Sequence, residues 1–359
     1  MKALFVKFKL FQKWLRNSFK IQLLALIFIL SGAIFVSVSM GYVKIPCGEI
    51  IKILLYKISG EAFFIKDIND LFSGIVLDVR LPRILTAAIV GSGLALSGVV
   101  FQGILLNPLA DPYTLGVSSG AAFGASLALF FNFDFCGVYS VSFFAFLGAV
   151  LTLVFVLFLS FSGKASLDNQ FSSNNLILSG IIVTAILSAG INFLKFMADE
   201  QVSVIIFWLM GSFNSKTWTD VLLTLVFVCT GFLIFLFYAM DLNLMSLGNK
   251  MASSLGVDTK KTPFILLVAS SLVTAVCVSV SGIIGFVGLL VPHMMRSVTG
   301  PDNKKLIPVS MLAGAILLLC ADTITRAFLP VEVPIGVITA LIGGPFFCYI
   351  FKKKQNKLN

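Results

Sequence analysis

The long apolar segment from Ile84 to Leu106 constrains the fold of this chain more than any other feature. It ends in a sharp polar reversal, Asn-Pro-Leu-Ala-Asp-Pro at residues 107–112, and a second Gly-rich apolar segment follows. In lipid, every backbone polar group must be paired inside a helix, so polar turns fall at the membrane surface. The pattern therefore predicts membrane helices joined by short turns rather than a water-soluble core.

Composition leads to the same class of protein. Hydrophobic residues make up 58% of the chain, charged residues only 12%, and the mean hydropathy is +1.03. These values lie far outside the range of soluble domains. The longest stretch between apolar segments, residues 41–79, is too short for an ordinary soluble domain. We therefore treat residues 1–359 as a single transmembrane domain.

Hydropathy and turn signals predict an all-α membrane protein with about ten transmembrane helices. The seventh and eighth spans follow each other directly and hinge near Ser281-Gly282. An amphipathic piece, Val202–Phe213, is expected to form a re-entrant or surface helix. The predicted spans are residues 21–40, 81–106, 114–131, 141–161, 175–197, 218–239, 263–281, 282–296, 306–321 and 335–351.

The distribution of basic residues predicts the orientation. If the N-terminal segment 1–20 is cytoplasmic, most of the 26 Lys and Arg residues fall on the cytoplasmic side. The positive-inside rule then places both termini in the cytoplasm, which agrees with an even number of spans. This topology also accounts for the net charge of +10, and no soluble basic domain remains that would bind nucleic acid.

The sequence offers no catalytic or metal chemistry. It contains no G-x-x-x-x-G-K-[ST] phosphate loop, and it has a single histidine, His293, whereas a metal site needs several ligand residues at the right spacing. We therefore expect no enzyme activity, no catalytic residue, no metal site and no cofactor. The six cysteines form no CxxC pair, although Cys47 and Cys136 fall on the same predicted side and are able to pair.

Three segments carry a resemblance to a known family. These are Arg80-Leu-Pro-Arg83 with the reversal at 107–112 and the following Leu-Gly-Val-Ser-Ser-Gly, then Gly282–Arg296, and finally Pro334–Phe347. Together they resemble the FecCD family, the permease subunits of the ABC importers for iron-siderophore complexes, haem and vitamin B12.

The resemblance implies a permease in the cytoplasmic (inner) membrane that moves an iron chelate, such as a siderophore complex or haem, while a separate subunit hydrolyses ATP. The implied partners are an ATP-binding ABC subunit, an extracytoplasmic substrate-binding protein, a second permease copy or a paralogue, and membrane lipid. Cobalamin is an alternative cargo. An ion-coupled secondary carrier is less favoured, because few ionisable residues lie deep in the spans.

The loop 240–262 is the longest predicted cytoplasmic loop between spans. Its apolar residues recur at spacings of three and four, which predicts a short amphipathic helix with glycine turns near its ends. On pattern alone this helix is also compatible with lying on the membrane surface. Its Leu-Gly-x-x-x-Ala-x-x-Leu-Gly arrangement resembles the family's segment that docks in the ATPase. The predicted coupling residues are Leu244, Leu247, Gly248, Met251, Ala252, Leu255 and Gly256.

Three arginines, Arg80, Arg83 and Arg326, fall on the predicted outer side, where acidic residues otherwise dominate. An arginine fork suits reversible pairing with a partner's carboxylates. The resemblance implies that all three receive glutamates of the binding protein. Two alternatives are that they anchor helix ends at the lipid head groups, or that they pair with carboxylates of this chain, namely Asp78, Asp322 and Glu332.

The transport pathway is the least specified feature. The resemblance implies a pore lined by the fifth and tenth spans and closed by the turn before the fifth. The corresponding pathway or gate residues are Ser173, Asn174, Gly343, Gly344 and Pro345. The glycines serve equally well as close contacts between helices.

Overall fold

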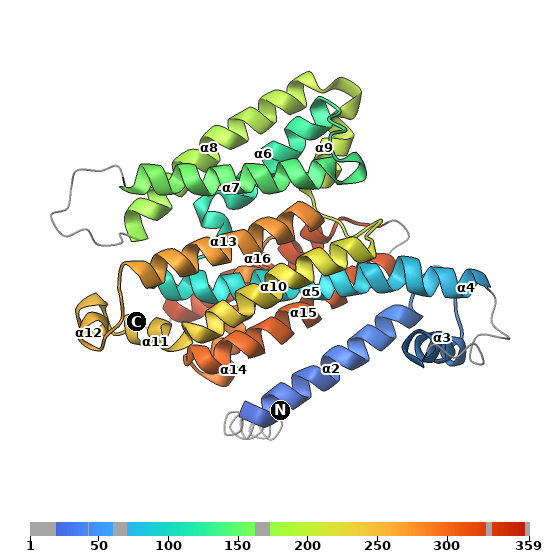
Figure 1. Ribbon diagram of the computed structural model, residues 1–359, viewed down its shortest axis with the longest axis horizontal. Helices are drawn as coiled ribbons and strands as arrows, with labels where there is room; N and C mark the ends of the chain where they lie inside the picture. The colour runs from blue at the N-terminus through green and yellow to red at the C-terminus, as the bar shows by residue number, and fades with distance from the viewer. Residues whose placement is uncertain (1–18, 42, 60–69, 162–172, 328–331, 356–359) are drawn as a thin grey trace.

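The computed structural model describes residues 19–41, 43–59, 70–161, 173–327 and 332–355. Most of the predicted cytoplasmic segment 1–20 therefore lies outside the described residues. The described chain is helical, and no strand occurs in it (Figure 1). Its α-helices are α2 (Phe19–Ser39), α3 (Cys47–Ser59), α4 (Asp70–Gly74), α5 (Leu81–Ile104), α6 (Val117–Phe130), α7 (Ser140–Phe161), α8 (Ser173–Met197), α9 (Val202–Leu209), α10 (Trp218–Phe237), α11 (Ala239–Met245), α12 (Asn249–Ser254), α13 (Lys261–Ser281), α14 (Val287–Thr299), α15 (Asn303–Ala327) and α16 (Ile335–Gln355).

Every predicted span coincides with a helix, which confirms the all-α membrane fold. Within the described residues, seven helical segments are long and apolar enough to cross a membrane. The helix α6 and the Ile335–Cys348 part of α16 are shorter apolar segments, and α14 has only 13 residues. The surface piece predicted at 202–213 is the short helix α9, which follows a 3-10 turn.

The second span begins earlier than the sequence predicts. The helix α4, a π-helical turn η2 (Ile75–Arg80) and α5 form one continuous segment from Asp70 to Ile104. Arg80 and Arg83 therefore lie within this helix rather than at its N-terminal end. A π-helical turn is a rare local geometry that re-aims side chains and is frequently found at functional sites.

The polar reversal after α5 is held by short-range side-chain caps. Asn107 Oδ1 accepts the Leu109 N–H at 3.0 Å, and Asp111 Oδ1 accepts the Tyr113 N–H at 3.1 Å. These are the local bonds by which Asn and Asp stabilise turns. The Tyr113 hydroxyl then donates to the Ile284 carbonyl at 2.8 Å, which ties the reversal to the segment between α13 and α14.

The predicted hinge between the seventh and eighth spans is present, but it is longer than expected. The helix α13 ends at Ser281, and α14 begins only at Val287. Gly282 has a φ of +72°, and a Cβ there would lie 2.4 Å from the Trp208 carbonyl oxygen. Only glycine fits this close approach with a left-handed φ. We call residues 282–286 the hinge segment.

The helix α5 occupies the centre of the bundle and packs against α10, α13, α14 and α15 (Figure 1). The helices α6, α7 and α8 form a group on one side, and α2 lies on the other side against α15. Small residues permit the closest helix contacts: Gly91 meets Gly314, and Gly98 meets Gly288. Such contacts are the typical packing device of membrane helices, because lipid supplies no hydrophobic driving force between them.

Candidate functional site: a cavity between two ends of the bundle

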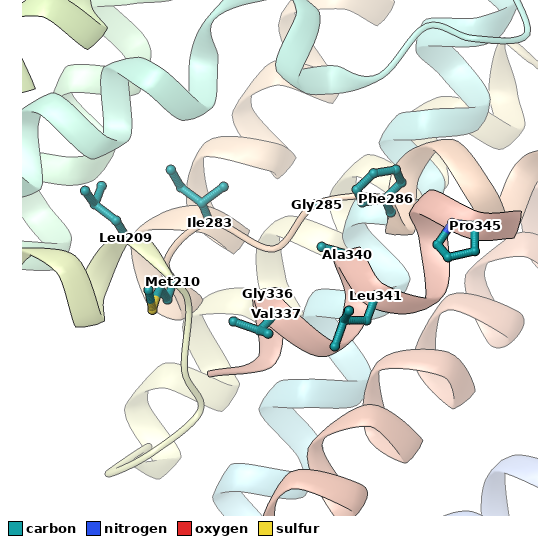
Figure 2. A pocket seen from close by; sticks show the side chains of 10 residues that line it. All are labelled: Leu209, Met210, Ile283, Gly285, Phe286, Gly336, Val337, Ala340, Leu341 and Pro345. Atoms are coloured by element: carbon teal, nitrogen blue, oxygen red, sulfur yellow. The ribbon is translucent and has the colours of Figure 1, made fainter. Parts of the chain in front are cut away.

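An apolar cavity of about 560 Å³ opens beside α16. Figure 2 shows that its wall comes from three separate parts of the chain: the end of α9 with Leu209 and Met210, the hinge segment with Phe286, and α16 with Leu341. The start of α16 is fixed to the end of α9, because the Gly336 N–H donates to the Met210 carbonyl at 3.0 Å. The cavity therefore lies where segments distant in sequence converge.

The structure brings part of the predicted pathway to this cavity. Pro345 lines it, and the buried Gly343 packs directly against the ring of Phe286, which is also part of the wall. A Cβ at Gly344 would meet open space. Ser173 and Asn174 lie at the first turn of α8 and do not line the cavity.

A second hollow, of about 210 Å³, lies between α6, α8 and the same wall, and sequence reasoning missed it. It contains Ser188, Asn192 and Lys195 of α8 and shares two wall residues, Leu209 and Ile283, with the larger cavity. The sequence signal was available, because polar residues recur on α8 at spacings of four and three. The high apolar content of this span masks the polar row, which becomes apparent only when α6 packs against α8.

The predicted docking arginines are buried. The exposed fractions of Arg80, Arg83 and Arg326 are 4%, 7% and 7%. Two of them cap the end of α2: Arg80 donates to the carbonyls of Val38 and Val43, and Arg326 donates to those of Ser37 and Met40. Cations and donors at a helix C-terminus satisfy its free carbonyls and its dipole.

Arg83 instead binds carboxylates. Its guanidinium contacts Asp322 of α15 at 2.9 Å and Glu332, just before α16, at 3.0 Å. The side chain of Asp322 is fully buried, whereas that of Glu332 is 34% exposed. Pairing within the chain, one of the alternatives considered from the sequence, is therefore present for Arg83.

At the opposite end of the bundle, the loop 240–262 forms two helices where one was predicted (Figure 1). The helix α11 ends at Met245 and α12 begins at Asn249, because Gly248, at a φ of +102°, turns the chain between them. The apolar residues consequently divide into two sets. Ala252 is buried in a small cluster with Met245 and Val257, and the partly buried Leu244 packs against it.

The second apolar set of this loop faces outward. Leu247, Met251 and Leu255 have exposed fractions of 59%, 56% and 55%. Gly256, at a φ of +90°, turns the chain directly after Leu255. We call Leu247, Met251 and Leu255 the apolar tip. Three large exposed apolar side chains gathered on a short polar loop mark a contact surface for another protein or for lipid.

Two further features bear on the predicted chemistry. Cys47 and Cys136 are both exposed and both free. Within the described ranges, no group of three or more His, Cys, Asp or Glu side chains is placed to hold a metal ion.

Comparison with known proteins decides the family. The model of the FecCD transport family matches residues 26–353, which is most of the chain. The chain belongs to the FecCD transport family. It is 42% identical over 281 residues to the cobalamin import system permease protein BtuC of Halobacterium salinarum, a match that covers 78% of this chain and 74% of that protein. It is 37% identical over 294 residues to the hemin transport system permease protein HmuU of Yersinia pestis, a match that covers 80% of this chain and 86% of that protein.

The fold of this FecCD permease matches a solved structure. A metal-chelate type ABC transporter, described in an inward-facing conformation, superposes with a TM-score of 0.79 at 35% identity and covers 92% of this chain and 98% of that one. The protein is therefore a multi-pass permease of the cytoplasmic membrane and an importer subunit rather than an enzyme. ATP hydrolysis in such importers resides in a separate subunit.

Proposed function

We propose that this FecCD permease carries an iron chelate, such as a siderophore complex or haem. The observation that carries the proposal is the apolar cavity of about 560 Å³ beside α16. Its volume falls in the range of sites for whole organic ligands, of roughly 300–1,000 Å³, and is far larger than a bare ion needs. Cobalamin is the alternative cargo, since a cobalamin permease is among the relatives.

The test is reconstituted transport. The permease would be placed in liposomes with the ATP-binding subunit and the binding protein encoded beside it, and given radiolabelled ferric siderophore, haem and cobalamin in turn. We expect ATP-dependent uptake of an iron chelate. Uptake of cobalamin alone would contradict the proposal and identify cobalamin as the cargo. Uptake driven by an ion gradient without ATP would overturn the importer mechanism.

The proposed ATPase contact is the apolar tip, Leu247, Met251 and Leu255, at the end of the bundle where α2 begins and α16 ends (Figure 1). This end is cytoplasmic in the proposed topology, with both termini inside. Leu244 and Ala252 support the tip from within, and Gly248 and Gly256 set its turns. Closure of the paired ATPases would then move α12 and the adjoining helix α11.

The proposed docking surface for the binding protein lies at the other end, where η2 meets the start of α5 and where α15 ends (Figure 1). These segments contain Arg80, Arg83 and Arg326. Because all three are buried and hold partners, a carboxylate of the binding protein reaches Arg83 only by exchange with Glu332, the partly exposed member of the cluster. Glu332 lies three residues before the start of α16, which forms part of the cavity wall. Docking would thus be coupled to movement of that wall.

The proposed pathway runs through the cavity, with Gly343, Gly344 and Pro345 on α16 along one wall. Ser173 and Asn174, at the start of α8, would form its cytoplasmic gate. The cavity is open to its surroundings, and a second permease copy or a close paralogue would enclose it. Crosslinking of paired cysteines introduced at position 341 in two copies tests this arrangement, since Leu341 is 65% exposed at the cavity rim.

A further inference from the structure

One face of α8 carries a row of polar side chains through an otherwise apolar helix. Thr184, Ser188, Asn192 and Lys195 follow at spacings of four, four and three, which places them on the same face. Large apolar side chains such as Ile186 and Phe193 are exposed elsewhere on this helix. Polar and charged groups within membrane helices are unfavourable and mark functional positions.

This row leads into the smaller hollow. Ser188, Asn192 and Lys195 line it from α8, and Ser119 lines it from α6, which packs against α8. Lys195 is partly buried and forms no ion pair with any residue in the described part of the chain. An ammonium group, an amide and two hydroxyls together offer several hydrogen-bond donors and one positive charge, which suits a carboxylate or another oxyanion.

The hollow adjoins the larger apolar cavity, since Leu209 and Ile283 belong to both walls. A ligand with an apolar body and an anionic group would place the body against Phe286 and Leu341 and the anion beside Lys195. A small inorganic oxyanion would leave the apolar wall unused, and a neutral ligand would leave the Lys195 charge uncompensated.

We propose that Lys195, with Asn192, Ser188 and Ser119, binds an anionic group of the cargo, so that the permease favours chelates that bear carboxylates on an apolar body. This inference rests on the proposed function and narrows its substrate class. The competing structural role for Lys195 is stabilisation of the last turn of α8, where a cation interacts favourably with the helix dipole.

Haem is a suitable probe, because it joins two carboxylates to an apolar ring. The full permease in lipid nanodiscs would be titrated with haem and with haem whose carboxylates are esterified, and binding would be followed by quenching of tryptophan fluorescence. We expect Lys195→Gln to weaken haem binding about tenfold, the loss typical of one charge-assisted hydrogen bond. Lys195→Arg should restore most of the affinity. Lys52→Gln, an exposed lysine of α3, is the matched control and should bind as the parent does.

The esterified probe separates binding from folding. It should bind parent and Lys195→Gln alike, because the charge partner is absent from the ligand. Equal haem affinity in parent and Lys195→Gln, an equal loss for haem and its ester, or no saturable haem binding to the parent would each overturn the inference. ATP-driven chelate uptake by the same preparation decides the proposed function independently, so the two failures are distinguishable.

Discussion

Arg83 on α5 and Asp322 on α15 form a buried ion pair across 239 positions of sequence, with Nε to Oδ1 at 3.0 Å and Nη2 to Oδ1 at 2.9 Å. The pair joins the central helix to the helix that packs against it most extensively. Removing one member of a buried pair leaves an uncompensated charge, which is strongly destabilising. The arginine cluster therefore holds the bundle together, whatever it binds from outside.

Replacement of Asp322 tests this role. Asp322→Asn should lower the free energy of unfolding by about 3–5 kcal/mol, because Arg83 remains buried without its main counter-charge. Thermal unfolding in detergent measures the loss. Asp78→Asn changes an exposed carboxylate two residues before Arg80 and should have little effect. Equal melting temperatures for both variants would contradict the structural role.

Replacement of Glu332 tests the exchange proposed for docking. Glu332→Gln weakens the competitor for Arg83 and should leave folding intact, because its side chain is partly exposed and Asp322 still binds the arginine. Capture of the loaded binding protein should strengthen by up to about fivefold, in keeping with the ~0.2–1 kcal/mol of an exposed pair. Surface plasmon resonance at low salt measures the affinity for the loaded binding protein. Glu49→Gln in α3, at the same end of the bundle, serves as a control. Unchanged or weaker capture would count against exchange.

A change in the apolar tip tests coupling to the ATPase. Met251→Asp should leave the melting temperature unchanged because the side chain is exposed, while co-purification with the ATP-binding subunit and uptake are lost. Ala252→Asp on the same short helix should instead unfold the loop, since that position is buried. If Met251→Asp retained full uptake, the tip would be assigned to the lipid surface.

Close helix packing makes a sharp prediction at Gly98. A Cβ there would lie 1.9 Å from the Gly288 carbonyl oxygen, so Gly98→Ala must force α5 and α14 apart. Overpacking of this kind reduces stability by about 1–3 kcal/mol or more. Gly32→Ala on α2 meets nothing within 4 Å and should be neutral or slightly stabilising. Thermal unfolding of the two variants measures the difference, and equal melting temperatures would contradict the prediction.

The reversal after α5 should make stability depend on pH. Burial raises the pKa of Asp111 to about 6 from the usual 3.8, although the Tyr113 N–H opposes the shift. The folded state therefore holds this proton more tightly than the unfolded state, and stability should fall as pH rises from about 4 to 6. Asp111→Asn keeps a capping acceptor without titrating, so its melting temperature should vary less over that interval. An identical pH profile would contradict the assignment.

Much of the architecture was readable from the sequence, for a physical reason. Lipid requires each spanning segment to satisfy its own backbone, so apolar runs such as 84–106 and 218–239 predict helices without any tertiary information. The Asn107 and Asp111 turns and the Ser281-Gly282 break were predictable in the same way, because their bonds are local. The family resemblance followed from segments that the fold places in α5, α14 and α16, and α14 packs against both of the others.

Only the tertiary structure decided how the long-range groups meet. The sequence alone left Arg83 able to face a partner, a head group or a carboxylate, and packing of α5 against α15 selected Asp322 and Glu332. The sequence alone also predicted a single helix in the loop 240–262, whereas Gly248 separates two helices there. The hollow beside Lys195 was not predicted. Local periodicity determines which side of a helix is apolar or polar, but pairing between residues hundreds of positions apart depends on the packing of whole helices.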